Sequence, residues 1–434
     1  MKKFLTDLKS SFWFVPAIMV LAAMALALAA IELDRAVGAE ALARYPRFFG
    51  THAEGARQLV AAIAGSTITV AGVVFSITIV ALALAAAQYS PRVLRNFMGD
   101  RANQLVLGVF VGVYVYCILV LRTVRGGENS FVPGIAILIA IALALVSIGF
   151  LIFFIHHIAT SIQVSEITAR IARETLKSVR DAPRGEGPAE NSEPLTSRLA
   201  GLTWGGVAAS RSGYIQHVHT DELAVCASES GRVLRMERAV GEFVVKGERL
   251  LSVSGSEPPS EPLVAALNDA YVLNTYRDLS QDPAFGVEQL VDIAIRALSP
   301  GINDTGTARN ALNYITEILC TLAACGHGNE RYCQQEGVVV LIKRTQTFKD
   351  LLQSALGSIR RNSMENLDMT FAMLTSLAAL TSVIATPEAR EAIAQELAAL
   401  EESLNSAQWV SADKAKITAA LRETWSTLGA PREL

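Results

Sequence analysis

Five hydroxyl side chains lie within one uncharged apolar stretch, and their types and spacing are the first in this chain to suggest chemistry. The stretch reads GSTITVAGVVFSITIVALALAAAQYS, residues 65–90, and the five hydroxyls between Gly65 and Ile79 are Ser66, Thr67, Thr69, Ser76 and Thr78. Hydroxyls in such a segment can pack helices together, line a water-filled path, or donate to carbonyl oxygens of their own helix. Which of these uses applies decides whether the segment is structural or conducting.

A narrow stripe of small residues follows the same segment when it is drawn as a helix. At about 100° per residue the stripe covers about 60° of arc, and its members include Gly65, Thr69, Gly72, Ser76 and Ala83. Such a stripe lets another backbone approach closely, and it would equally suit an uncharged pore lining. We expect Gly72 to admit a neighbouring backbone and Val74 to face lipid. Gly108-x-x-x-Gly112 predicts a second close-packing face.

Residue patterns that could carry catalysis are weak in this sequence. It has no Gly-Lys-Ser phosphate loop, no Gly-x-Ser-x-Gly elbow and no His-Glu-x-x-His, and its expected membrane spans hold no Asp or Glu for a proton relay. His217 and His219 share a strand face at period two, which fits a metal site or, more commonly, an ordinary surface pair. The five cysteines match no ligand spacing. We therefore expect neither an enzyme nor a bound metal or cofactor.

The composition is that of a membrane protein with a large soluble part. Of the 434 residues, 51% are hydrophobic and only 18% are charged. Four apolar runs reach the length of about 20 residues that a membrane-spanning helix needs, and they cover residues 10–31, 59–87, 104–121 and 131–155. The first run exceeds the apolar core of a signal peptide, so we expect it to be retained.

The basic residues that flank these runs predict their orientation. Lys and Arg cluster before the first run, between the second and third, and after the fourth. Four spans put both termini on the same side, and the basic flanks and free cysteines favour the cytoplasm.

Beyond the fourth run the apolar spacing continues as a helix that leaves the membrane. Its basic residues form one stripe at steps of three and four, which suits either a solvated face or contact with lipid headgroups; they are Arg170, Arg173, Lys177 and Arg180. A polar segment rich in Pro and Gly follows at residues 181–197 and predicts a flexible loop. We assign residues 1–165 to a four-helix transmembrane domain and residues 166–198 to the basic juxtamembrane helix and linker.

The rest of the chain predicts a small β module at residues 199–256 and an all-α domain at residues 257–434. The segment GRVLRMERAVGEFVVKGERLLSV reads as a strand, Gly241, a short apolar strand, Gly247 and another strand, and it resembles half of the barrel-sandwich module of biotinyl and lipoyl domains. The attachment lysine is missing, so no swinging-arm cofactor is implied. Helical spacing dominates after residue 257. Pro300 and Gly301 break one helix there, and Asn303, Asp304 or Thr305 can cap the next. That turn is either structural or a contact for a ligand or subunit.

Three segments together resemble a known family over nearly the whole chain. They are the stretch from Gly65 to Phe97, HHIATSIQVS, and above all FGVEQLVDIAIRALSPGINDTGTA. They look like a widespread family of predicted bacterial inner-membrane proteins catalogued as a domain of unknown function. The resemblance implies this architecture and a bacterial inner-membrane location, and it implies no activity. Family members usually carry Pro where this chain has Thr305.

Two functions from different classes fit these observations. The leading one is an oligomeric, channel-like conduit that its cytoplasmic region gates or assembles. The alternative is a non-conducting membrane scaffold or sensor whose cytoplasmic domains bind a protein or small-molecule partner. The expected partners are the lipid bilayer and further copies of the chain, whereas the net charge of −3 argues against nucleic acid.

Overall fold

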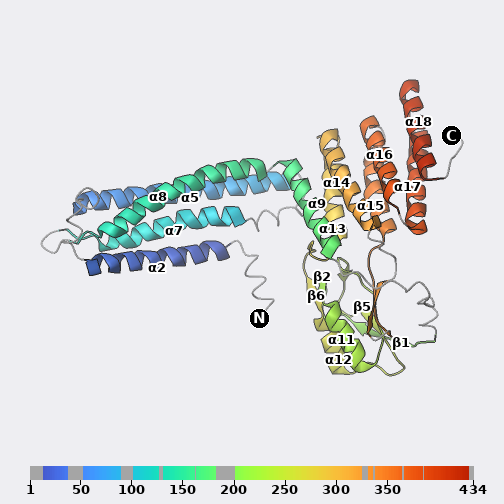
Figure 1. Ribbon diagram of the computed structural model, residues 1–434, viewed down its shortest axis with the longest axis horizontal. Helices are drawn as coiled ribbons and strands as arrows, with labels where there is room; N and C mark the ends of the chain where they lie inside the picture. The colour runs from blue at the N-terminus through green and yellow to red at the C-terminus, as the bar shows by residue number, and fades with distance from the viewer. Residues whose placement is uncertain are drawn as a thin grey trace. The chain divides into compact units, whose positions relative to one another are not determined.

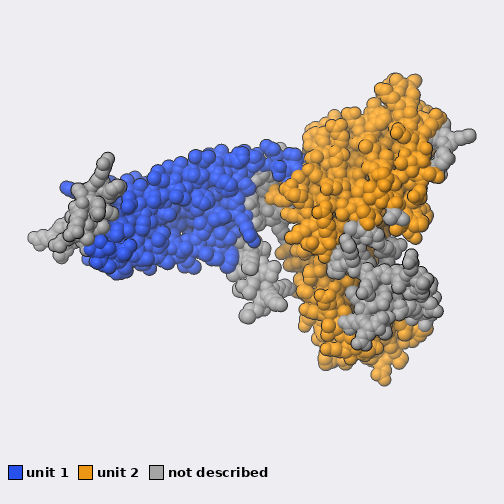
Figure 2. Space-filling model, in the orientation of Figure 1, with its two compact units in different colours: residues 1–166 blue, residues 167–434 orange. Residues whose placement is uncertain are grey.

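A computed structural model of the chain divides into two compact units, residues 1–166 and residues 167–434, coloured separately in Figure 2. The structure describes residues 13–37, 52–88, 101–126, 131–161, 163–181, 201–324, 331–335, 338–363, 366–384 and 386–429. The loop expected at 181–197 lies outside these residues, apart from Asp181.

Four long helices run side by side in the first unit (Figure 1). They are α2 (Phe14–Val37), α5 (Ala53–Gln88), α7 (Arg101–Thr123) and α8 (Gly134–Ser161). Each is long and apolar enough to cross a membrane, and each overlaps one of the four expected runs. Helix α7 contacts the other three, which gives it the largest buried share.

Two glycines let α7 pack closely against α2. A Cβ at Gly108 would lie 2.5 Å from Met19 Sδ and 3.2 Å from Met19 Cβ, and one at Gly112 would lie 3.5 Å from Ala23 Cβ. Because glycine has no side chain, the two backbones can approach each other at both positions. The Gly-x-x-x-Gly pattern therefore lies at a helix–helix contact within this unit.

Side chains from α2 and α5 satisfy helix ends in the first unit. Asp34 is buried, and its carboxylate accepts the N–H groups of Ile135 (2.8 Å) and Ala136 (2.9 Å) in the first turn of α8. Arg57 donates to the Val124 carbonyl just after α7. Helix α2 continues past Ile31, so a buried carboxylate lies in a candidate span, contrary to our expectation from the sequence.

The second unit begins within α9 (Val164–Asp181) and contains six further long helices. They are α13 (Pro283–Ala297), α14 (Thr305–Ala324), α15 (Phe348–Asn362), α16 (Leu367–Val383), α17 (Pro387–Ser406) and α18 (Ser411–Thr427). Side-chain caps fix several of their starts: Thr347 and Asp350 form a capping box on α15, and Asn366 and Thr386 cap α16 and α17.

Two small sheets complete the second unit. One has five strands in the order β1 (Trp204–Ala208), β5 (Arg249–Ser254), β3 (Leu234–Met236), β8 (Val338–Lys343) and β7 (Arg331–Gln335). The other has three strands in the order β4 (Phe243–Val244), β2 (Gly213–Val218) and β6 (Tyr271–Asn274). Helices α11 (Thr220–Ser230) and α12 (Glu261–Asp269) accompany them, and a shared apolar core includes Ile215, Leu223, Leu250, Leu267 and Leu341.

The secondary structure differs in two places from the expected β module and all-α domain. The described part of residues 257–434 contains the three strands β6, β7 and β8. Strand β6 pairs with β2, and β8 pairs in parallel with β3. Within residues 199–256, where we expect a β module, Thr220–Ser230 forms the helix α11, whose first turn carries Asp221 and Glu222 and whose end is capped by Gly231 at φ 62°. Whether such a short segment forms a strand depends on its pairing with segments far away in the chain. The local spacing of apolar residues does not reveal that pairing.

Candidate functional site

Close packing joins α9 to the start of α13 in the second unit. A Cβ at Gly286 would lie 2.8 Å from Cβ and 2.9 Å from Cγ2 of Thr175, which is fully buried. Real Cβ atoms essentially never show such short contacts, so only glycine fits here without a shift. The helix that follows the last span is therefore seated directly on α13.

Polar contacts fix α9 on both sides of this point. Ser178 Oγ donates to the Ser280 carbonyl (3.2 Å), and Asn310 Nδ2 of α14 donates to Thr168 Oγ1 (3.2 Å). Since both α9 side chains are buried, each bond also satisfies a polar group that water reaches poorly. Helix α9 thus contacts α13, α14 and the segment 275–282 that precedes α13.

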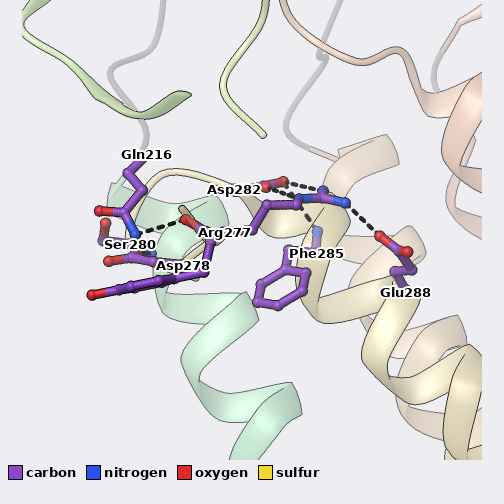
Figure 3. Close-up of polar contacts among 8 residues, drawn as sticks. Gln216, Arg277, Asp278, Ser280, Asp282, Phe285 and Glu288 are labelled. Atoms are coloured by element: carbon purple, nitrogen blue, oxygen red, sulfur yellow. Dashed lines mark hydrogen bonds and ion pairs between the residues drawn. The ribbon is translucent and has the colours of Figure 1, made fainter. Parts of the chain in front are cut away.

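An arginine holds that segment through two carboxylates (Figure 3). Arg277 Nε and Nη2 donate to the two oxygens of Asp282 at 2.8 Å and 3.0 Å, and Arg277 Nη1 pairs with Glu288 of α13. Asp282 Oδ1 also accepts the Phe285 N–H (3.0 Å) and so caps α13, while the guanidinium lies 4.9 Å from the Phe285 ring centroid. This bidentate, largely buried pair fixes where α13 begins.

The electrostatics of the pair favour the charged guanidinium. Burial lowers the pKa of Arg277, but hydrogen bonds and charge from Asp282 and Glu288 outweigh it, so the pKa lies above its ordinary value. Gly241 packs over the pair at φ 89°, and a Cβ there would lie 2.8 Å from Asp282 Cγ. Positive φ and close approach both require glycine at this position.

Gln281 links the same segment to strand β2. Its Oε1 accepts the Val218 N–H (3.0 Å), and its Nε2 lies 3.2 Å from Nε2 of His217. The rings of His217 and His219 are 4.6 Å apart at 62°, with His219 at the N-cap position of α11. Burial, followed by the charge of His219, lowers the pKa of His217. Among the described residues, no group of three or more His, Cys, Asp or Glu could hold a metal ion.

The small-residue stripe of α5 faces away from its own bundle. Gly65, Thr69, Gly72, Ser76 and Ala83 are exposed, and a Cβ at Gly65 or Gly72 would meet nothing within 4 Å. Among the described residues no backbone approaches Gly72, so the expectation that Gly72 admits a neighbouring backbone stays a prediction for contacts with another chain. Val74, expected to face lipid, is buried at 2% exposure, since the opposite face of α5 packs inward.

Four of the five hydroxyls singled out in α5 donate hydrogen bonds to carbonyl oxygens of their own helix. Thr69 donates to the Gly65 carbonyl (2.8 Å), Thr78 to Val74 (2.8 Å), and Ser66 and Thr67 to Ile63 (3.0 and 2.8 Å). A threonine bonded to the preceding turn needs no water and no partner helix. These four hydroxyls are satisfied by their own helix.

The basic residues of α9 form a mixed-charge face. Arg173, Lys177 and Arg180 are exposed and Arg170 is half-buried, but Glu166, Glu174 and Asp181 are exposed among them. Helical geometry interleaves these acids with the bases on one face. That mixture suits a solvated face better than contact with anionic headgroups.

The turn between α13 and α14 is held by local bonds. Asn303 adopts φ 48°, which asparagine tolerates better than most residues. Asp304 accepts the Thr307 N–H (3.0 Å) and hydroxyl (2.6 Å) at the start of α14, and these bonds lower its pKa. Pro300 lies between α13 and this cap, and Asn366 Nδ2 donates to Thr305 Oγ1 (2.9 Å).

Sequence reasoning missed the residues at the α9–α13 contact. Asp282 followed by Pro283 is a recognisable helix start, because aspartate favours the N-cap and proline the first turn. Nothing local to the sequence pairs Arg277 with Asp282, or Thr175 with Gly286.

Comparisons with known proteins identify relatives of this chain but no solved structure. Residues 9–379 match the family model described as predicted membrane protein (DUF2254). Uncharacterized proteins of Mycobacterium bovis and Mycobacterium tuberculosis are 32% identical over 362 residues, covering 81% of this chain and 68% of each relative. No solved structure matches the chain.

Proposed function

This chain belongs to the DUF2254 family of predicted membrane proteins, and we propose that it acts in the membrane as an anchored sensor or scaffold. In this proposal the second unit binds a partner, and α9 carries the resulting change to the last membrane helix. The observation that supports the proposal most directly is the close contact of α9 with α13 at Thr175 and Gly286.

Chain continuity supports this route. Helix α8 ends at Ser161 and α9 begins at Val164. Gln163 N–H donates to the Thr160 carbonyl (3.1 Å), and Glu166 N–H donates to the Gln163 carbonyl (3.0 Å). In this proposal a displacement of α9 acts on the end of α8, because few residues separate the two helices in the chain.

The buried side chains of the four-helix bundle are mostly apolar, which favours a sensor over a conduit, although Asp34, Thr67, Asn103, Gln104 and Ser147 are also buried there. The two buried clusters of the bundle are apolar and draw on all four helices, including Ala30, Val60, Tyr116, Ala140 and Phe154. The one polar group among these five cluster residues is satisfied, since Tyr116 donates to the Ala136 carbonyl (2.9 Å). Apolar packing of this kind resists ions, because a charge entering it loses its hydration.

The full chain in planar bilayers tests this choice. A sensor or scaffold gives no discrete conductance over a range of voltages and salts. Reproducible unitary conductance that is absent from mock-purified membranes would overturn it.

The second candidate is a conduit between copies of the chain, and the outward stripe of α5 favours it. If Thr69 and Ser76 line such a path, cysteines at these positions react with a water-soluble thiol reagent in a background without the native cysteines. Ile77, which is 41% exposed and lies about 100° from Ser76 on the same helix, provides a control outside the stripe. Equal reactivity at all three positions, or none, contradicts the conduit.

A further inference from the structure

The contact between His217 and Gln281 has only one chemically consistent arrangement. Gln281 Oε1 accepts the Val218 N–H, and this bond fixes the orientation of the amide. Its Nε2 can only donate, so Nε2 of His217, 3.2 Å away, must accept and carry no proton. The contact therefore exists only when His217 is neutral.

Charged groups around His217 come from more than one element. His219 adds a like charge when protonated, whereas Asp278 of the 275–282 segment and Glu222 of α11 attract a cation. The strand partner of His217 in β6 is Val272, which carries no charge. When His217 is protonated, it loses its hydrogen bond to Gln281. Its positive charge is then repelled by a protonated His219 and attracted by Asp278 and Glu222.

We propose that His217 and Gln281 form a proton-sensitive latch that holds the 275–282 segment against β2 and releases it on acidification. The latch regulates the sensor proposed above and rests on that function. Gln281 immediately precedes Asp282, and Ser280 is the acceptor for Ser178 of α9. Release of the segment therefore reaches the α9–α13 contact directly.

The direction of the effect follows from linkage. The pKa of folded His217 lies below the ordinary value of 6.5, so the unfolded chain binds this proton more readily. The stability contributed by neutral His217 is fully present above that value and is lost as pH falls through the folded pKa. Acid thus weakens this region, and neutral pH restores it.

Hydrogen–deuterium exchange on the full chain in bilayer discs tests the latch between about pH 7 and about pH 5. After correction for intrinsic exchange, amides of segment 275–286 should open about fivefold more readily in acid, the size set by one net hydrogen bond. His217→Gln keeps a polar side chain without titrating and should abolish the change. His219→Gln is the matched control and should retain the change, with its midpoint moved to higher pH because the charge of His219 no longer lowers the pKa of His217.

Gln281→Glu provides a test in which the sign reverses. A carboxylate can accept from both Val218 N–H and protonated His217, so this variant should become more protected in acid. Persistence of the wild-type response in His217→Gln, or no response in the wild type, overturns the latch.

Peptides from α9 separate the latch from the proposed function. A response in 275–286 together with α9 supports both. A response in 275–286 without α9 supports the latch and contradicts coupling through α9. No response in 275–286, with α9 still disturbed by Gly286→Ala, contradicts the latch alone.

Discussion

Substituting Gly286 by alanine probes the contact on which the proposed coupling depends. The added Cβ would lie 2.8 Å from Thr175 Cβ, and ordinary contact begins at 3.4 Å, so the two helices must separate locally by roughly the difference. Rotation of the Thr175 side chain gives no relief, since its Cβ does not move. Overpacking of this kind costs about 1 to 3 kcal/mol, and the better helix propensity of alanine offsets less than about 1 kcal/mol.

The expected net loss is about 1 to 2 kcal/mol, which lowers the melting temperature of a unit this size by about 2 to 6 °C. Thermal unfolding of the full chain in detergent, followed by tryptophan fluorescence, measures it. Gly301→Ala is the control, because a Cβ there meets nothing within 4 Å. In a double-mutant cycle, Thr175→Gly should recover part of the loss. Equal stability of the two alanine variants, or additivity in the cycle, refutes the reasoning.

Three further predictions concern contacts elsewhere in the chain. Gly108→Ile should weaken the packing of α2 on α7 and lower thermal stability in detergent, whereas Gly65→Ile, where a Cβ meets nothing within 4 Å, should leave it unchanged. Arg277→Met should destabilise the second unit by about 3 to 5 kcal/mol in denaturant unfolding, because it strands the buried Asp282 carboxylate; a loss below about 1 kcal/mol would contradict the account. Asp304→Ala should cost about 1 kcal/mol by removing a helix cap. The pKa of Asp304 is lowered, so its contribution is present above 3.8 and is lost as pH falls through the folded pKa; a loss unchanged in acid would argue against the cap.

Long periodic segments of the fold are predictable from the sequence, and contacts between distant segments are not. The four membrane helices follow from uninterrupted apolar runs, which few soluble segments imitate. The helix cap formed by Asp304 can also be predicted from the sequence, because its carboxylate accepts a hydrogen bond from a residue only three positions away. Strand β6 is different: its four residues sit inside a helical pattern and become a strand by pairing with β2.

The same limit applies to the candidate site and to the α5 stripe. Angular spacing correctly groups Gly65 with Gly72, yet it cannot say whether that face points into the bundle or out of it. The inward face of α5 carries Val74 instead. At the site, Thr175 and Gly286 are more than a hundred residues apart, so their contact depends on the tertiary fold and has no local signature.

The central claim is that α9 carries changes from the second unit to the last membrane helix. Amide exchange across residues 150–181 in bilayer discs, comparing Gly286→Ala with Gly301→Ala, tests it most directly. The account predicts that Gly286→Ala exchanges faster both in α9 and in the last turns of α8, while Gly301→Ala matches the wild type. Faster exchange confined to α9, with α8 unchanged, would contradict it.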